Sequence, residues 1–447
     1  MVEMKKKFFG TDGVRGEANK FPMTPEIVLK LGMSIGSYYF KNNTRNTVLI
    51  GKDTRLSGYM FESALISGLT SVGMNVILAG PMPTPAVAML TKSLGANLGI
   101  VLSASHNLYH DNGIKIFGPN GYKISDQDEL EVESRVLSGV ALSSPNKLGR
   151  SNRLDDEIGR YVDSLRSIFK FNKMFSGIKV VIDCANGAAY KAGPLVLREL
   201  GAEVVPINVN PNGININDNC GSTHPFQMAK KVVEEKANIG FALDGDADRL
   251  VVSDEKGNLI DGDHLIGAIV NHLKKSDQLR KNFVVTTLMS NIGLEIYLQS
   301  IGIDLIRSKV GDKYVLEEMI KKGINFGGEK SGHLIFLDHS TTGDGLLAAI
   351  KLLSIISNEN MNPSKILHPF KLFPQMIRNI STSNINTVDS DIMLNIIKEW
   401  ERRLGDHGRI LVRPSGTEPL IRIMAEGKDS KLLQGAIESI EKALLRG

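Results

Sequence analysis

The sequence predicts an α/β protein with three similar α/β domains, whose sheets are mixed and mainly parallel, and a C-terminal α+β domain. Short apolar, β-branched runs alternate with segments of helical spacing over most of the chain, a pattern typical of parallel sheets covered by helices. The alternation restarts after a polar, serine-rich stretch at residues 142–153. With 447 residues, the chain has room for two to four domains at roughly 100–200 residues each.

The first domain contains three predicted strands, at residues 46–51, 76–79 and 98–102. Two segments with helical spacing separate them, at residues 61–73 and 85–95. The first of these ends at a glycine and the second has a proline near its start, which are common helix boundaries.

The same order of elements follows twice more. The second round has predicted strands at residues 179–183, 202–209 and 239–243 and predicted helices at 193–201 and 225–236. The third round has predicted helices at 265–275, from 291 and at 313–322, and strands at 283–287 and 304–307. The remaining segment is a small α+β unit of helix, strand, strand and helix, at residues 390–404, 409–413, 420–425 and 431–445.

We therefore expect four domains, at residues 1–153, 154–256, 257–370 and 371–447. No repeat is visible at the level of single residues, so the likeness among the first three rests on their pattern alone.

Composition restricts the class of protein. Hydrophobic residues make up 42% and charged residues 23% of the chain, and the net charge is +4. A charge this small and diffuse does not indicate a nucleic-acid-binding protein. The two cysteines, Cys184 and Cys220, cannot form a disulfide framework, the first residues contain no signal peptide, and the apolar segment 346–356 is too short to span a membrane. We expect a cytoplasmic protein that binds neither nucleic acid nor membrane.

The sharpest motif lies directly after the predicted strand 239–243. Residues 244–249 are Asp-Gly-Asp-Ala-Asp-Arg, so Asp244, Asp246 and Asp248 crowd together at the end of a strand where α/β proteins bind ligands. Such crowding favours a hard cation, and oxygen ligands favour Mg²⁺. A calcium loop ending at Glu255 competes, but Arg249 stands where it needs glycine and a strand follows instead of a helix. A solvated acidic turn is the third interpretation.

Three further loops carry groups suited to phosphate or sugar chemistry. Ser105 follows the strand 98–102, where a serine acts as a nucleophile or as a helix cap, and the motif of serine hydrolases is missing. Residues 327–333 (Gly-Gly-Glu-Lys-Ser-Gly-His) combine donors and acceptors that suit sugar hydroxyls. Residues 413–417 (Arg-Pro-Ser-Gly-Thr) form either a phosphate-binding loop or a simple turn.

Taken in order, these motifs resemble those of the α-D-phosphohexomutase superfamily over almost the whole chain. The matching segments are residues 9–16, 103–107, 111–115, 183–187, 210–213, 220–224, 244–249, 310–314, 328–333 and 413–419. Residues 9–16 and 220–224 favour the branch that acts on glucosamine phosphates over the phosphoglucomutase and phosphomannomutase branches.

Three positions depart from the pattern of the family. Leu108 replaces a proline after the serine loop, which would loosen that loop because proline fixes φ. Ala247 replaces a common glycine, a change that is tolerable if φ is negative there. Lys330 occupies a position that differs between branches and bears on the choice of sugar.

The resemblance implies a mechanism. Ser105 would carry a phosphoryl group, required for activity, and pass it to a sugar monophosphate. The resulting bisphosphate would turn over in a central cleft between the four domains and return its other phosphate to Ser105. The net reaction would interconvert glucosamine 6-phosphate and glucosamine 1-phosphate for the UDP-N-acetylglucosamine and cell-wall pathway, with the C-terminal domain closing as a lid.

The resemblance also implies roles for individual residues. Asp244, Asp246 and Asp248 would hold Mg²⁺ together with a phosphate oxygen on Ser105. The residues that act on the transferring phosphoryl group or its proton would be Arg15, Lys115 and His333, the last as a candidate general base. The implied substrate-binding residues are Arg249, Glu329, Ser331, Arg413, Ser415, Gly416 and Thr417.

The expected partner is a sugar phosphate, and the family suggests a homodimer. The alternatives are a phosphoglucomutase/phosphomannomutase with the same mechanism, a metal-dependent phosphatase, and a sugar-phosphate binder without catalysis.

Overall fold

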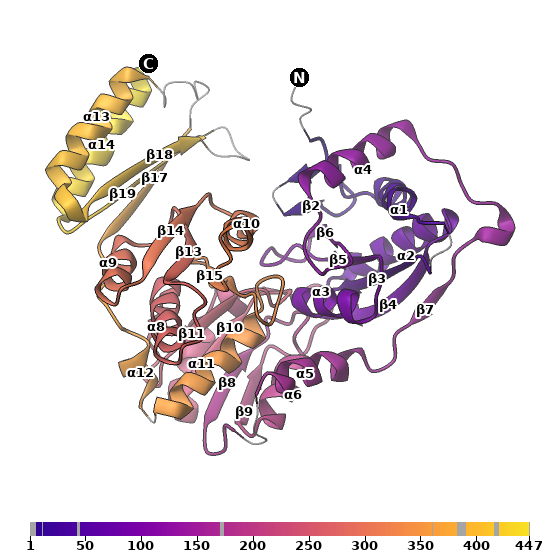
Figure 1. Cartoon of the computed structure of the whole chain (residues 1–447), viewed down its shortest axis with the longest axis horizontal. Coiled ribbons are helices and arrows are strands. Elements are labelled where there is room, and N and C mark those ends of the chain that lie inside the picture. The colour runs from indigo at the N-terminus through magenta and orange to yellow at the C-terminus, as the bar shows by residue number, and fades with distance from the viewer. Residues whose placement is uncertain are drawn as a thin grey trace. The chain divides into compact units, whose positions relative to one another are not determined.

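The computed structural model describes residues 6–10, 12–42, 45–169, 174–359, 361–381, 390–414 and 420–446. The chain divides into two compact units, whose helices and strands are labelled in Figure 1 where there is room. Unit 1 comprises residues 1–288 and 306–368, and unit 2 comprises residues 289–305 and 369–447. Unit 1 contains most of the three predicted α/β domains, whose boundaries therefore remain a prediction.

The first sheet of unit 1 has seven strands in the order β1-β2-β6-β5-β3-β4-β7. Their bounds are β1 Phe9–Gly10, β2 Gly13–Glu17, β3 Thr47–Lys52, β4 Asn75–Pro81, β5 Leu98–Leu102, β6 Asp111–Phe117 and β7 Ser151–Arg153. The three predicted strands are confirmed as β3, β4 and β5. The mixed α/β class is also confirmed, but parallel pairs do not dominate this sheet. Three strand pairs are parallel and three are antiparallel, because β1, β2 and β6 add an antiparallel half that we did not predict.

Helices cover both faces of this sheet, so its central strands are buried on both sides. Along β3, Val48 and Ile50 face a core that they share with helices α1 (Pro25–Tyr39), α2 (Leu56–Ser71) and α4 (Asp126–Ser138). Helix α3 (Thr84–Ser93) packs on β3 and β5. A capping box from Ser125 and Asp128 begins α4.

The second sheet of unit 1 has the order β12-β11-β10-β8-β9. Its strands are β8 Lys179–Asp183, β9 Glu203–Ile207, β10 Ile239–Leu243, β11 Leu250–Ser253 and β12 Leu259–Ile260, and the accompanying helices are α5 Glu157–Ser167, α6 Ala192–Glu199 and α7 Phe226–Glu235. Strands β10 and β11 are antiparallel, with Leu243 opposite Leu250. The acidic segment 244–249 is therefore the tight connection of a β-hairpin.

The third sheet has the order β14-β13-β15-β16. Its elements are α8 Gly262–Lys275, β13 Phe283–Thr287, β14 Asp304–Ser308, α10 Asp312–Lys322, β15 Phe326–Gly328, β16 Leu334–Phe336, α11 Gly345–Glu359 and α12 Pro363–Ile366. Helix α11 contains the apolar segment 346–356, most of whose side chains are buried. In the described part of the chain, no helix is both long and apolar enough to cross a membrane.

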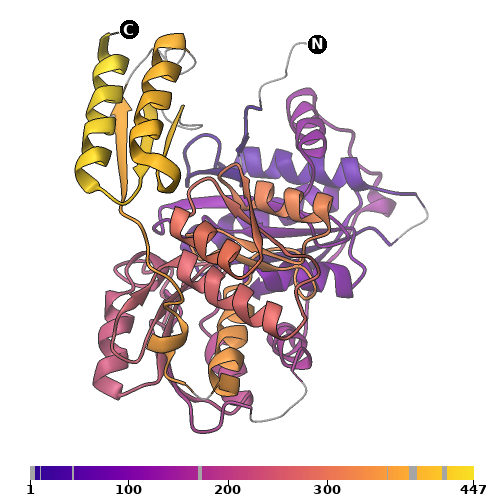
Figure 2. The same ribbon diagram turned by 60° about the vertical axis from the view of Figure 1, so that its left-hand side comes forward.

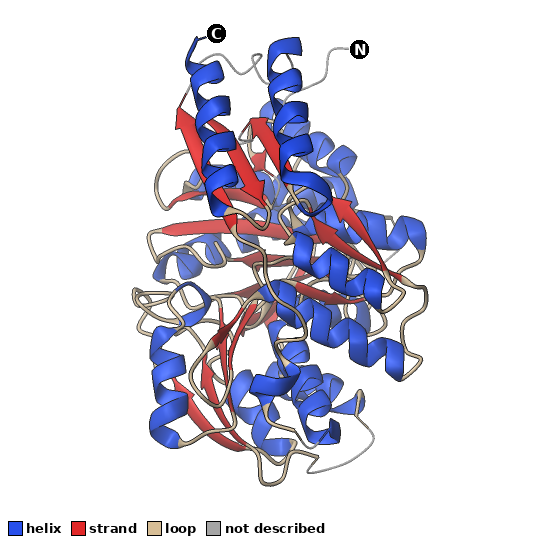
Figure 3. Ribbon diagram, turned by 90° about the vertical axis from the view of Figure 1, so that its left-hand side faces the viewer, coloured by secondary structure: helices blue, strands red, loops and turns tan. Residues whose placement is uncertain are grey.

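Unit 2 is an α+β unit. Its elements are α9 Ile292–Ser300, β17 Gln375–Ser381, α13 Asp391–Leu404, β18 Arg409–Pro414, β19 Leu420–Glu426 and α14 Ser430–Arg446. It contains the predicted helix, strand, strand and helix, together with β17, which we did not predict, and α9, which we expected in the third α/β domain. The three strands form an antiparallel sheet in the order β17-β19-β18. Helices α13 and α14 lie side by side on this sheet and bury one apolar core against it (Figures 2 and 3).

Candidate active site

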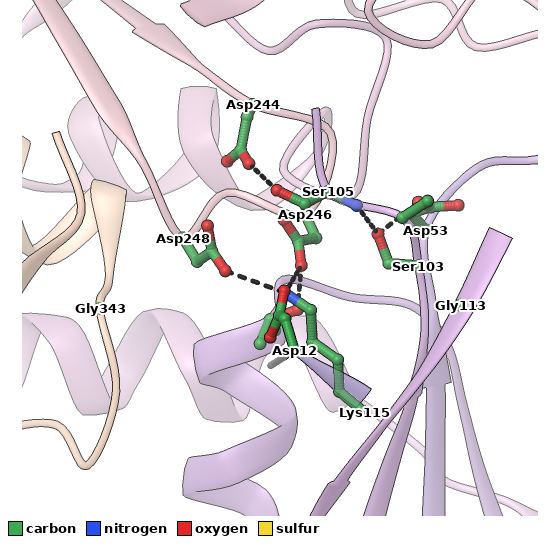
Figure 4. Close-up of polar contacts among 12 residues, drawn as sticks. Asp12, Asp53, Ser103, Ser105, Gly113, Lys115, Asp244, Asp246, Asp248 and Gly343 are labelled. Carbon is green, nitrogen blue, oxygen red and sulfur yellow. Dashed lines mark hydrogen bonds and ion pairs between the residues drawn. The ribbon is translucent and has the colours of Figure 1, made fainter. Parts of the chain in front are cut away.

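The serine loop connects β5 to the antiparallel strand β6, and it places Ser105 in a buried position. The backbone of Ser105 is left-handed, with φ +51°, which is costly for any residue other than glycine, asparagine or aspartate. The Ser105 amide donates to Ser103 Oγ at 2.9 Å, and Ser103 Oγ donates to Asp53 Oδ2 at 2.6 Å (Figure 4). These two bonds hold the backbone of Ser105 on the side away from its hydroxyl.

The acidic loop of residues 244–249, which we call the metal loop, contacts the serine loop directly. Ser105 Oγ donates to Asp244 Oδ2 at 2.6 Å (Figure 4). Carboxylate oxygens of Asp244, Asp246 and Asp248 lie within 4.8 Å of one another, and all three side chains are buried. The structure thus brings together the serine and the three aspartates that the sequence singled out.

The three aspartates fit a bound Mg²⁺. The Oδ1 atoms of Asp246 and Asp248 are buried and accept no hydrogen bond from the described residues, although His333 Nδ1 approaches Asp248 Oδ1 to 3.6 Å. Burial and the neighbouring carboxylates of Asp248 and Asp246 hold the pKa of Asp244 well above its usual value. Buried oxygens without hydrogen bonds and like charges at this spacing are the conditions that a hard dication relieves.

The calcium-loop interpretation does not fit. The Glu255 carboxylate accepts hydrogen bonds from the Ser364 amide, at 2.9 Å, and from the Ser364 hydroxyl, so it is engaged elsewhere. The loop that contains Asp244 also continues into strand β11 instead of a helix.

The condition that we set for Ala247, a negative φ, is not met. The φ of Ala247 is +60°, in the left-handed region, and its side chain is buried. The hairpin between β10 and β11 turns so tightly that this position needs a positive φ, which explains why glycine is common there. The alanine therefore carries a backbone strain of about 1–2 kcal/mol.

Lys115 is the buried cation of the site. Its Nζ lies 2.8 Å from Asp246 Oδ2, 3.0 Å from Asp248 Oδ2 and 3.4 Å from Asp12 Oδ2 (Figure 4). Burial opposes its charge, but the three carboxylates raise the pKa of Lys115 well above its usual value. Lys115 is therefore protonated throughout the neutral range.

Arg15 and His106 border the same loops. The Arg15 guanidinium pairs with Asp12 and reaches the Ala104 carbonyl at 3.5 Å. His106 Nδ1 lies 3.3 Å from Ser105 Oγ. Burial, together with the charges of Arg249 and Arg15, lowers the pKa of His106 to about 4, so its imidazole is neutral at pH 7.

His333 lies between two carboxylates. Its Nδ1 is 3.6 Å from Asp248 Oδ1, and its Nε2 is 3.6 Å from Asp312 Oδ2 and 3.1 Å from the Gly343 amide nitrogen. Burial alone would lower the pKa of His333, but the carboxylates raise it to about 9. Both ring nitrogens are engaged, so the geometry favours a bridging role over the expected role as general base.

His333 belongs to a closed ring of alternating charges. Lys123 Nζ joins Asp12 and Asp312, at 2.6 Å from each. Asp312 then faces His333, His333 faces Asp248, and Lys115 returns from Asp248 to Asp12. This ring connects the segments that carry the first, second and third predicted domains.

The predicted sugar loop contributes one buried and one exposed side chain. Glu329 is buried, and its Oε1 accepts from the Gly311 amide at 3.1 Å. Burial raises the pKa of Glu329, although His333 and Arg249 oppose this shift. Ser331 is exposed, and Lys330 Nζ lies 3.4 Å from Asp261 Oδ2, next to helix α8.

The predicted phosphate loop lies in unit 2. Ser415, Gly416 and Thr417 fall outside the described residues. Arg413 lies near the end of β18, directly opposite Arg422 of β19, and burial together with that second charge lowers the pKa of Arg413. Two arginines opposite each other across a strand pair repel each other, and a bound anion would relieve this repulsion.

The sequence analysis missed several residues of the site, namely Asp12, Asp53, Arg55, Lys123, Asn217 and Asp312. A weak signal existed for Asp53 and Arg55, because they follow strand β3, which neighbours β5 in the sheet. Asp12 and Asp312 lie inside motifs that we quoted, at residues 9–16 and 310–314, without a role assigned to them. Cys184 and Cys220 are buried free thiols and take no part in the site.

Comparisons with known proteins match the whole chain. Four phosphoglucomutase/phosphomannomutase domain families match in order: domain I at residues 6–141, domain II at 159–257, domain III at 261–373 and the C-terminal domain at 374–443. The phosphoglucosamine mutase of Maricaulis maris is 49% identical over 99% of both chains. The phosphoglucosamine mutase of Erythrobacter litoralis is 50% identical over 97% of this chain and 96% of its own length.

Solved structures share the fold. A phosphoglucomutase/phosphomannomutase family protein from Burkholderia thailandensis has a TM-score of 0.82 at 23% identity, covering 98% of this chain and 97% of its own. The N-acetylphosphoglucosamine mutase of Aspergillus fumigatus, solved with GlcNAc-6P and magnesium, has a TM-score of 0.63 at 14% identity, covering 98% and 95%. The resemblance to α-D-phosphohexomutases is thereby confirmed, and the chain belongs to the phosphoglucosamine mutase family of the phosphohexomutase isomerases.

Proposed function

We propose that this enzyme interconverts glucosamine 6-phosphate and glucosamine 1-phosphate through a phosphorylated Ser105 and glucosamine 1,6-bisphosphate. The observation that carries the proposal is the contact of 2.6 Å between Ser105 Oγ and Asp244 Oδ2, beside two further buried aspartates and Lys115. A serine hydroxyl at a metal-binding carboxylate is suited to carry a phosphoryl group that is transferred, and positioning plus electrostatics supply most of the catalysis of such transfers.

Each half-reaction exchanges one phosphate ester for another. The bond between phosphorus and Ser105 Oγ breaks as a bond forms from phosphorus to a sugar hydroxyl oxygen. The proton of that hydroxyl ends on Ser105 Oγ. The second half-reaction runs the same exchange in reverse at the other end of the sugar, so phosphate is conserved overall.

Asp244, Asp246 and Asp248 would hold Mg²⁺, which supplies charge neutralisation at a phosphate oxygen of Ser105. Lys115 is anchored by Asp12, Asp246 and Asp248 and remains charged, so it would stabilise the transferring phosphoryl group from one side. Arg15 would face the same group, since its guanidinium reaches the Ala104 carbonyl of the serine loop.

The other substrate contacts follow from the motifs. Arg249, Glu329 and Ser331 would bind the sugar. Arg413, Ser415, Gly416 and Thr417 would bind the phosphate that does not react, and the C-terminal domain would close over the bound substrate. We assign His333 to the bridge between Asp248 and Asp312, with general-base catalysis as the alternative that a pH–rate profile of His333→Gln would reveal.

Three experiments test the proposal. Turnover of glucosamine, glucose and mannose 1-phosphates is compared side by side, and glucosamine 1-phosphate should give the highest kcat/KM. Ser105→Ala should abolish isomerisation, whereas Ser138→Ala, at an exposed serine of α4, should retain it. Intact mass should place one phosphate on Ser105. Release of inorganic phosphate without isomerisation would support a phosphatase, and a better rate with glucose or mannose phosphates would support the sister branches.

The proposed setting is the cytoplasm, where the product would enter the synthesis of UDP-N-acetylglucosamine and cell-wall precursors. A homodimer remains part of the proposal, and light scattering of the purified enzyme tests it.

A further inference from the structure

We propose that Arg55 and Asn217 are positioning residues that lock the serine loop in its left-handed conformation and so direct Ser105 Oγ at Asp244. This inference rests on the proposed function, because it concerns the residue that would carry the phosphoryl group. Neither side chain belongs to the metal triad or to the expected substrate contacts. Arg55 is 0% exposed and Asn217 is 1% exposed, so each acts from beneath the loop.

Every N–H group of the Arg55 guanidinium donates a hydrogen bond to the serine loop, to Asp111 at the start of β6, or to Asp53. Nη2 donates to the carbonyls of Ser105, at 3.0 Å, and Asn107, at 2.8 Å. Nη1 donates to the carbonyls of Asp111, at 3.0 Å, and Leu108. Nε donates to Asp53 Oδ2 at 2.8 Å, so all five N–H donors have partners. The loop therefore wraps around one buried cation.

Asn217 grips two of the same carbonyls from another part of the chain. It lies in the loop between β9 and α7, close to the second sheet, and its Nδ2 donates to Ser105 O at 2.8 Å and to Asn107 O at 2.9 Å. The carbonyls of Ser105 and Asn107 thus each accept from both Arg55 and Asn217. Arg55 and Asn217 together form a clamp on these two carbonyls. The clamp ties the serine loop to the predicted second domain, which also carries the metal loop.

The metal loop is fitted to this arrangement. A Cβ atom at Gly245 would lie 2.6 Å from Ser105 O and 2.8 Å from Asn217 Nδ2, closer than real contacts allow. Glycine between Asp244 and Asp246 therefore lets the metal loop approach the clamped carbonyl. The position of Ser105 relative to Asp244 depends on all three segments.

The clamp has two physical consequences for phosphoryl transfer. It turns the carbonyl oxygens of the loop toward a buried positive charge, which keeps those negative dipoles away from an anionic phosphate. It also offsets the strain of the left-handed backbone at Ser105, because the alternative conformations would leave buried carbonyls without partners.

The same arginine holds the position where the family usually has proline. Arg55 donates a hydrogen bond directly to the Leu108 carbonyl, which restrains the loop there without the fixed φ of a proline.

Asn217 offers a test with a matched control. Asn219 also has a left-handed backbone, with φ +52° against +57° for Asn217, but it is exposed, and among the described residues its side chain bonds to the neighbouring Asp218 alone. Asn217→Ala and Asn219→Ala therefore have a similar cost from placing alanine at a positive φ. Only Asn217→Ala also removes the hydrogen bonds to the carbonyls of Ser105 and Asn107. Asn217→Asp and Asn219→Asp form a second pair, which keeps side-chain volume and tolerance of positive φ.

The main readout is the rate at which dephosphorylated full-length enzyme regains a phosphate on Ser105 from glucose 1,6-bisphosphate, followed by intact mass. Both Asn217 variants should slow this step and kcat about tenfold to a hundredfold, the range expected for a reacting group misplaced by about 1 Å. KM should change less than about twofold, because the substrate would touch neither residue. Both Asn219 variants should stay close to wild type.

The outcomes are separable. If folded Asn217 variants keep the wild-type rate while only their melting temperature falls, the clamp is merely structural and the inference is overturned. If Asn217→Ala does not fold, the Asn217→Asp pair and Arg55→Lys, which loses the planar fork, decide by the same readout. If wild type takes up phosphate on Ser105 but does not isomerise glucosamine phosphates, the proposed sugar is wrong and the clamp comparison still stands.

Discussion

Asp344 is a buried aspartate, and its replacement by asparagine should stabilise the enzyme more at pH 7.5 than at pH 4.5. It precedes helix α11, is 3% exposed, and accepts from Tyr161 Oη at 2.9 Å and from the Leu347 amide at 2.9 Å. Burial raises the pKa of Asp344 from 3.8 to about 6, although those hydrogen bonds oppose the shift. The neighbouring Gly345 amide donates to the Ala247 carbonyl, so this corner supports the metal loop.

The sign and size of the effect follow from linkage. Because the folded state holds the proton more tightly than the unfolded chain, the stabilisation from this group is complete below pH 3.8 and is lost as the pH rises through about 6. At 1.36 kcal/mol per pH unit, the loss is about 3 kcal/mol at pH 7.5. Asp344→Asn keeps an oxygen for the Leu347 amide and does not ionise, so it should avoid this loss.

Thermal unfolding at two pH values tests the reasoning. Asp344→Asn should melt about 4 °C above wild type at pH 7.5, for a cooperative unit of roughly 350 residues, and only about 1 °C above it at pH 4.5. Asp155→Asn, at an exposed aspartate, should show no such difference. A variant that melts below wild type at pH 7.5, or an advantage independent of pH, would refute the argument.

Three further predictions concern the site and its support. Ala247→Gly should retain activity and raise the melting temperature by about 1 °C. The backbone strain that it relieves, about 1–2 kcal/mol, exceeds the entropy cost of glycine, about 0.5–1 kcal/mol. A melting temperature that falls by several degrees would contradict this. Asp246→Asn should weaken Mg²⁺ binding by about tenfold or more in calorimetric titration, and chelation should abolish wild-type turnover until Mg²⁺ is restored. Glu133→Gln, which loses a charged acceptor of the Lys7, Phe8 and Phe9 amides, should loosen the segment that leads to Arg15, seen as faster amide exchange there and a higher KM.

The parts of the fold that could be predicted are those with strong local patterns. Strands β5, β8, β10 and β13 have the predicted bounds because most of their residues are apolar or β-branched. Strands β2 and β6 were missed because glycine, charged and amide residues interrupt them. Their strand structure depends on antiparallel pairing between segments far apart in the chain, with Val14 opposite Ile114.

The same distinction applies to the site. Asp244, Asp246, Asp248 and Ser105 could be found because each follows a predicted strand, where ligands bind. Arg55 also follows a strand, but this signal is weak because an arginine in a loop is usually a solvated charge. Its burial results from four carbonyls of a loop about fifty residues away in sequence. The ion pairs of Lys123 likewise join segments that only the fold brings together.

Charge balance explains how so acidic a site can accept a phosphate dianion. The acidic side chains around it are Asp12, Asp244, Asp246, Asp248, Asp312 and Glu329, and the basic ones are Arg15, Lys115, Lys123, Arg249 and His333. Mg²⁺ brings two positive charges and a phosphoserine about 1.5–2 negative ones, so the two together leave the balance nearly unchanged. Either alone would shift it by about two charges in a buried region where water screens poorly. We therefore predict that metal and phosphoserine bind as a pair: the dephosphorylated enzyme should bind Mg²⁺ more weakly in calorimetric titration than the phosphorylated enzyme, and equal affinities would contradict this argument.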